Sequence, residues 1–199
     1  MHIPKVCVAF DESNHGRDPE IVVAVWSQIP SDYSEIQVRG RLKHLECDVL
    51  KKTLRNEKRG FRFIVLRGDA VKGNGHLLRS TPYLIPGVLN QLHREGHTID
   101  KLELQIDGDL REIDSFRIKE AVEDLNEMSQ TSLESIKGYK KNKNQVYTYS
   151  HLLRTADSLA HSLFRNYDLI MSFCKSGEEI NSLYGKEERS CPGPRRNGR

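Results

Sequence analysis

Short hydrophobic segments alternate with polar stretches along this chain. Four of them have the length of a strand, at 5–10, 21–25, 61–66 and 101–106, and the first three are rich in β-branched or aromatic residues. The last segment alternates strictly between polar and apolar residues, and a weaker fifth strand is predicted at 133–138. A polar stretch with Asn, Gly, Asp and Pro joins the first two segments, which predicts an antiparallel hairpin.

Between the predicted strands, apolar residues recur at helical spacing. The helices expected from this spacing cover residues 37–57, 83–94, 113–128 and 149–165. The last has the clearest apolar stripe, and residues 67–81, which contain three glycines, are expected to form a loop. Strands that alternate with helices after an initial hairpin predict an α/β fold, with a central mixed sheet of about five strands flanked by helices.

The size of the chain favours one domain. It has 199 residues, and 31 basic side chains against 28 acidic ones give a net charge of +3. We expect a domain over residues 1–175 and a polar, basic, disordered tail over 176–199, because residues 189–199 carry four arginines and no acid.

No apolar run approaches the ~20 residues that a membrane helix needs, and no signal peptide is visible, so a cytoplasmic protein without membrane contact is expected. The four cysteines lack the close pairing of a zinc site.

Acidic residues follow two of the predicted strands. Asp11 and Glu12 come directly after the first, and Asp107 and then Asp109 come after the fourth. Sites in open α/β sheets form outside the carboxyl ends of strands, so these acids converge if the two strands are parallel neighbours. Asp157 lies on the border of the apolar stripe of the last helix, where it can face the edge of the sheet.

A cluster of carboxylates needs a cation to offset its repulsion. Oxygen ligands of this kind suit Mg²⁺ or Mn²⁺, and two ions about 3.5–4 Å apart would activate water for phosphodiester cleavage. The simpler interpretations are that Asp107 is a turn residue or helix cap and that Asp157 is a solvated helix acid. Asp109 could also take the place of Asp107 as a ligand.

Several motifs resemble those of ribonuclease H-like nucleases. Residues 10–16 read Phe-Asp-Glu-Ser-Asn-His-Gly and precede a second apolar strand, which resembles the opening of type 2 ribonucleases H. The segment is more similar to an uncharacterised ribonuclease H-like family whose first strand ends in Asp-Glu-Ser-Gly. Residues 154–160, Arg-Thr-Ala-Asp-Ser-Leu-Ala, resemble the final helix of that family and the late aspartate of RuvC-type resolvases. Residues 104–107, Leu-Gln-Ile-Asp, fit the same scheme, so the resemblance spans roughly residues 5–165.

This resemblance implies a ribonuclease H-like fold and assigns roles to the acids. Asp11 corresponds to the metal ligand of the first strand, and Glu12 to the glutamate beside it in type 2 ribonucleases H, where it is expected to be an accessory ligand or orienting base. Asp107 corresponds to the ligand of the fourth strand and Asp157 to that of the last helix. Residues 13–16 replace the Ala-Gly-Arg-Gly loop that reads a ribose 2′-hydroxyl in those enzymes, so ribonucleotide specificity is not implied.

Basic residues gather between the last strand and the last helix. Four lysines that could grip phosphates lie there, with Tyr139 and Tyr147 interleaved for stacking on bases: Lys137, Lys140, Lys141 and Lys143. The alternative is a solvated surface loop. His15 and His151 are candidate general acids beside Asp11 and Asp157, or else ordinary loop and helix-cap residues.

The function expected from these features is divalent-metal-dependent hydrolysis of a nucleic-acid phosphodiester. The expected partner is a nucleic acid, and the expected cofactor is a pair of Mg²⁺ or Mn²⁺ ions. Two alternatives stay open. One is a nucleic-acid-binding or regulatory protein that keeps the fold without cleavage. The other is a metal-dependent hydrolase of small phosphorylated compounds. The choice among DNA, RNA, hybrid and junction, and the oligomeric state, are not determined by the sequence.

Overall fold

A computed structural model describes residues 1–14, 17–39, 42–67, 76–108, 115–116, 118–120, 131–139 and 146–168. The predicted tail at 176–199 and most of the predicted helix at 113–128 lie outside these residues. Across the described part of the chain, none of the helices combines the length and the apolar character that crossing a membrane requires.

Five strands form the central sheet. In chain order they are β1 (His2–Ser13), β2 (Glu20–Ser27), β4 (Arg59–Leu66), β5 (Thr98–Asp107) and β6 (Ser132–Tyr139). Their spatial order is β4-β2-β1-β5-β6. β2 runs antiparallel to β1 and to β4, whereas β1, β5 and β6 are parallel to one another. The predicted hairpin, the mixed five-strand sheet and the α/β class are therefore confirmed.

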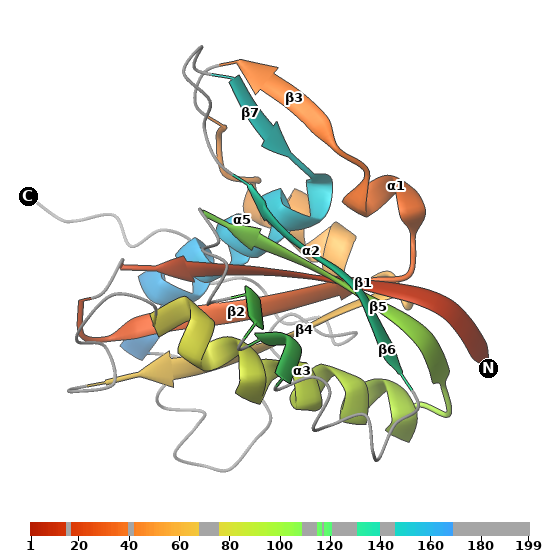
Figure 1. Cartoon of the computed structure of the whole chain (residues 1–199). Helices are drawn as coiled ribbons and strands as arrows, with labels where there is room; N and C mark the ends of the chain where they lie inside the picture. The colour runs from red at the N-terminus through yellow and green to blue at the C-terminus, as the bar shows by residue number, and fades with distance from the viewer. Residues whose placement is uncertain are drawn as a thin grey trace, which may run out of the picture.

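Each face of the sheet buries its own hydrophobic core. Strand alternation sends Val6, Val8 and Phe10 to the face covered by α3 (His76–Arg94). Cys7 and Ala9 point to the opposite face, which is covered by α5 (His151–Arg165) together with α2 (Cys47–Leu54). Figure 1 shows α3 along one face and α5 with α2 along the other. Because both faces are covered, the eight residues of β2 are all buried.

The helix predicted over residues 37–57 is only partly present. Residues 47–54 form α2, but β3 (Ile36–Arg39) is a strand that pairs antiparallel with β7 (Val146–Tyr149). Ile36 lies opposite Tyr149 and Val38 lies opposite Tyr147. The prediction was wrong there because the partner strand lies more than 100 positions away. Figure 1 shows this two-stranded ribbon standing at the top of the molecule, and the single-turn helix α1 (Pro30–Tyr33) precedes it.

The two long helices were predicted, with different starting points. α3 begins at His76, so residues 76–81, which were expected to belong to a loop, are helical. α5 begins one residue after Ser150, whose hydroxyl accepts a hydrogen bond from the backbone N–H of Leu153. This N-cap satisfies one of the free N–H groups of the first turn and fixes where the helix begins.

Candidate functional site

Asp11 and Asp107 lie at neighbouring carboxyl ends of parallel strands. The last pair in the β1–β5 register is Phe10 with Ile106, and each aspartate is the next residue of its strand. Asp11 pairs with Val23 of β2, which belongs to the core on the α5 side of the sheet. Ile106 belongs to the opposite core, so alternation turns Asp107 toward α5 as well. The predicted convergence of these two acids is thus present in the backbone.

Asp157 reaches the same region from α5. This helix packs on β1 and β2, and Ala156 and Ala160 are buried against the sheet. Asp157 follows Ala156 directly and keeps 29% of its side chain exposed, as expected for the border of the apolar stripe. The structure therefore brings an acid from β1, one from β5 and one from α5 to one edge of the sheet.

The electrostatics of Asp11 reflect this arrangement. Burial raises the pKa of the Asp11 carboxyl well above its ordinary value, and the charges of Asp107, Glu12 and Asp157 raise it further. The backbone N–H of Glu12 donates a hydrogen bond of 2.8 Å to Asp11 Oδ1, which opposes the shift. Asp11 is only 4% exposed, so water screens this repulsion poorly.

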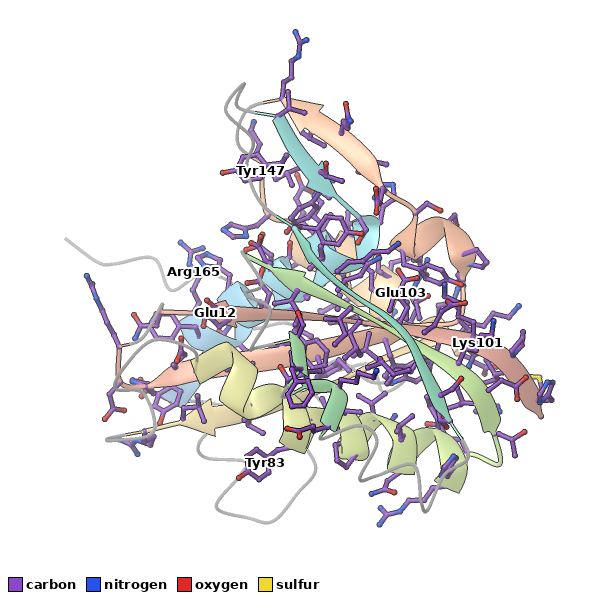
Figure 2. All side chains as sticks on the ribbon, viewed as in Figure 1. Glu12, Tyr83, Lys101, Glu103, Tyr147 and Arg165 are labelled. Atoms are coloured by element: carbon purple, nitrogen blue, oxygen red, sulfur yellow. The ribbon has the colours of Figure 1, made fainter. Side chains whose placement is uncertain are left out.

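Glu12 occupies a different position from Asp11. It pairs with Val22, which belongs to the α3-side core, so alternation directs Glu12 to the face opposite Asp11. Figure 2 shows Glu12 at one end of the sheet and Lys101 toward the other. Although Glu12 points to the opposite face, its negative charge still raises the pKa of Asp11, after the effects of burial and of Asp107. Glu12 is therefore an electrostatic neighbour of the cluster.

Tyr149 belongs to the same site, although sequence reasoning missed it. It ends β7, is buried, and carries a hydroxyl whose pKa is raised by burial and then by the charges of Asp11, Asp157 and Asp107. The hydroxyl therefore remains protonated at neutral pH. The sequence offered no signal for this placement beyond the position of Tyr149 just before the final helix, because β7 enters the fold through its pairing with β3.

His44 is a second residue that the sequence did not single out. Its Nδ1 lies 3.1 Å from Asp157 Oδ2, and its ring stacks on that of His161, with 4.1 Å between centroids and 3° between planes. His161 lies one helical turn after Asp157 on α5. Burial, followed by the proximity of His44, lowers the pKa of His161.

The acids by themselves do not form a closed metal site. Among the residues that the structure describes, no three histidine, cysteine, aspartate or glutamate side chains are arranged so that they could hold a metal ion. The chemistry of the donors nevertheless fits a hard divalent cation, since Asp11, Asp107 and Asp157 offer carboxylate oxygens alone. A cation bound there would offset the repulsion among these carboxylates, which adds to the effect of burial in raising the pKa of Asp11.

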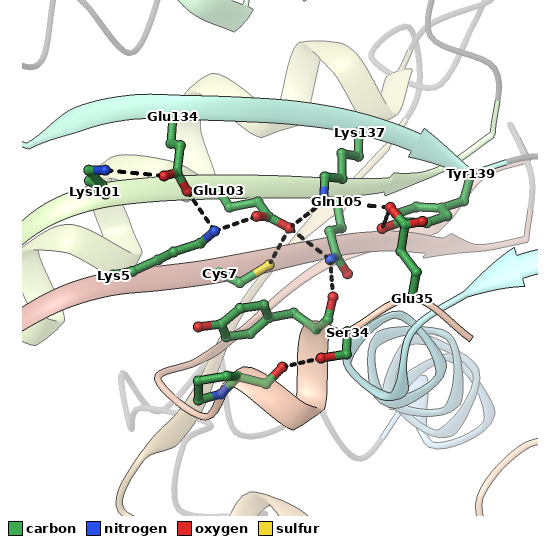
Figure 3. A network of polar contacts seen from close by, with 12 residues as sticks. Lys5, Cys7, Ser34, Glu35, Lys101, Glu103, Gln105, Glu134, Lys137 and Tyr139 are labelled. Carbon is green, nitrogen blue, oxygen red and sulfur yellow. Dashed lines mark hydrogen bonds and ion pairs between the residues drawn. The ribbon is translucent and has the colours of Figure 1, made fainter.

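Lys137, one of the predicted phosphate contacts, forms ion pairs with two glutamates. Its Nζ lies 3.4 Å from Glu103 Oε1 and 3.5 Å from Glu35 Oε1 (Figure 3). Glu103 is 3% exposed and also accepts a hydrogen bond of 2.7 Å from Lys5. Lys137 therefore helps to neutralise a buried acid. The other predicted phosphate contacts, Lys140, Lys141 and Lys143, lie outside the described residues, as do His15 and Asp109.

The polar network of Figure 3 continues to the start of α5. Gln105 Nε2 donates to Glu103 Oε1 and to the carbonyl of Tyr33, at 3.1 and 2.9 Å. Gln105 Oε1 accepts a 2.5 Å hydrogen bond from Ser150, the N-cap of α5. This chain of contacts fixes the beginning of the helix that carries Asp157 to the strand that carries Asp107. His151, the first residue of α5, is exposed.

Comparisons with known proteins give a distant structural likeness. No family model matches the chain, and none of the curated proteins compared with it matches. Among solved structures, it is similar to a chain in the structure of the PCNA:RNase HII complex from Archaeoglobus fulgidus. The TM-score is 0.40 and the identity 12%, over 87% of this chain and 77% of that chain.

The class of fold follows from the sheet itself. β1 and β2 form the first hairpin, β4 lies outside β2, and the acid-bearing β5 runs parallel to β1 on its other side. The protein has an α/β fold, with its central mixed sheet between α3 and the α5–α2 layer.

Proposed function

We propose that this protein is a divalent-metal-dependent nuclease that hydrolyses nucleic-acid phosphodiesters at the edge of the sheet where β1 and β5 end. The observation that carries the proposal is the environment of Asp11. A buried carboxylate within reach of the charges of Asp107, Asp157 and Glu12 is electrostatically unfavourable without a cation. Strongly perturbed acids of this kind are concentrated at functional sites.

In this proposal Asp11, Asp107 and Asp157 would hold Mg²⁺ or Mn²⁺, in a pair. When bound, these ions supply an activated water and stabilise charge at the phosphorus. Glu12 acts through its charge from the opposite face of β1. Tyr149 keeps its proton among the carboxylates and can donate a hydrogen bond to an anionic substrate.

The experiment that tests this is a nuclease panel with Mg²⁺ and with Mn²⁺, on single-stranded and duplex DNA, RNA, RNA–DNA hybrid and a four-way junction. Asp11→Asn and Asp157→Asn are compared with Asp100→Asn. Asp100 lies near the opposite end of β5 and is 54% exposed, so it is a matched control. We expect cleavage that depends on metal, is lost in the first two variants and is kept in the third.

Thermal melting with and without metal separates the other outcomes. A metal-induced rise in the melting temperature that Asp11→Asn abolishes, with no cleavage of any polymer, would replace the nuclease by a binding protein. Turnover of small phosphorylated compounds alone would assign a different hydrolase. Melting that metal leaves unchanged in the wild type would contradict the metal site itself.

A further inference from the structure

Residues 42–46, which precede α2, are docked on the face of α5 that carries Asp157. The carbonyl of Lys43 accepts a hydrogen bond of 3.2 Å from Arg154 Nε, and the N–H of Leu45 donates one of 2.8 Å to Ser158 Oγ. These contacts hold the residues on both sides of His44, so the position of its backbone is set by α5.

The ring of His44 is held as firmly as its backbone. Its plane lies parallel to that of His161, and its Nδ1 lies 3.1 Å from Asp157 Oδ2. Asp157 and His161 are four residues apart, so they share one face of the helix. The imidazole of His44 thus contacts a carboxylate at its Nδ1 and a second imidazole at one face of its ring.

We propose that His44 is a positioning residue that orients the carboxylate of Asp157 for cation binding; this rests on the metal site proposed above. Carboxylates that ligate metals are in turn hydrogen-bonded by neighbouring groups, which fix their orientation. His44 binds Oδ2, which restrains rotation of the carboxylate and presents Oδ1 in one orientation. The ordering of Asp157 is then complete before a cation arrives.

The chain offers a matched control for this pair. His2 Nε2 lies 3.1 Å from Asp100 Oδ2, the same distance as in the His44–Asp157 pair. His2 begins β1, whereas Asp11 lies near the other end of that strand. His2→Ala therefore removes an equivalent contact without touching the carboxylate cluster.

The test is a titration of the full-length protein with Mn²⁺. Binding is measured in two ways, by the melting temperature and by the electron paramagnetic resonance signal of free Mn²⁺. We expect His44→Ala to raise the Mn²⁺ concentration at half-saturation about tenfold, the lower end of the effect of such groups. His44→Asn places an amide N–H where Nδ1 stood and should restore half-saturation to within about threefold of the wild type, while His2→Ala leaves it unchanged.

A second variant distinguishes positioning from loop docking. Ser158→Ala removes the anchor of Leu45 but leaves the imidazole, so it should affect Mn²⁺ binding less than His44→Ala does. Equal half-saturation in His44→Ala and His2→Ala, or failure of His44→Asn to rescue, would overturn the role of His44. If Asp11→Asn leaves the Mn²⁺ response of the wild type intact, the proposed function fails instead.

Discussion

Asp11 and Asp107 each follow the last paired residue of two parallel, adjacent strands and face the same side of the sheet. Neighbouring strands lie about 4.8 Å apart, so this register brings two carboxylates together by backbone geometry alone. α5 adds Asp157 from the layer above. The stability of the metal-free protein should therefore depend on these charges.

Asp11→Asn should stabilise the protein in the presence of a chelator. Because burial and like charges raise the pKa of Asp11 in the folded state, its ionisation opposes folding as pH rises above about 4. The gain from Asn should be largest at pH 7–8 and shrink toward pH 4. Urea unfolding of both proteins across this range measures it. A wild type more stable than Asp11→Asn at pH 8 would contradict the repulsion.

The Asp32–Arg59 pair should give the opposite pH dependence. Burial raises the pKa of Asp32, but hydrogen bonds from Arg59 at 2.6 and 2.7 Å and from Ser27 at 2.6 Å lower it overall. The stabilisation that the ionised Asp32 carboxylate contributes is complete above about pH 4 and is lost as the pH falls through the lowered pKa of Asp32.

Asp32→Asn should therefore cost about 2 kcal/mol of unfolding free energy at pH 7 and less at pH 3. Asp18→Asn is the control, since Asp18 lies 3.6 Å from Arg67 with both side chains well exposed. We expect it to change stability by less than about 1 kcal/mol. An Asp32→Asn cost that stays the same at both pH values would mean that the charge of Asp32 is not stabilising.

Ser150→Ala should destabilise α5. The hydroxyl of Ser150 caps the helix through Leu153 N–H and donates to Gln105 Oε1, and the residue is fully buried. Loss of the cap and of this donor should cost about 1–2 kcal/mol in chemical denaturation. Ser34→Ala, at an exposed hydroxyl that contacts the Pro30 carbonyl, should cost less than about 0.5 kcal/mol. An equal loss of unfolding free energy in Ser150→Ala and Ser34→Ala would contradict the role of Ser150 in capping α5.

Two glycine variants should shift stability in opposite directions. A Cβ at Gly60 would lie 2.5 Å from the ring of Trp26, its partner across β2 and β4, so Gly60→Ala should cost about 1–3 kcal/mol. A Cβ at Gly87 of α3 would meet its nearest neighbour, Arg62 Cγ, only at 3.8 Å. Gly87→Ala should therefore stabilise the helix by up to about 1 kcal/mol. Melting temperatures that move in the same direction would contradict this difference.

Much of the framework followed from local sequence. The β-branched segments of β1 and β2 and the apolar stripe of α5 encode their own structure, because strand and helix periods are properties of neighbouring residues. The order of strand and acid at Asp11 and Asp107 is also local. These features were enough to predict a central mixed sheet and the strand ends that carry Asp11 and Asp107. The parallel pairing of β1 with β5 was only the condition under which these acids would converge, and the structure meets it.

Tertiary structure decided what surrounds those acids. β3 exists because its residues pair with β7, more than 100 positions away, and the same pairing brings Tyr149 to the cluster. His44 meets Asp157 only because the segment before α2 docks on α5. Lys137, which the sequence offered as a phosphate ligand, neutralises the buried Glu103.

The sequence by itself determined the five strands of the central sheet, the helices α3 and α5, and the acids after the first and fourth predicted strands, since each depends on the pattern within a few residues. Only the tertiary structure decided which side chains meet those acids. Contacts such as His44 with Asp157 join segments that are far apart along the chain. They depend on how these segments pack together, and the hydrophobic pattern within either segment does not encode that packing.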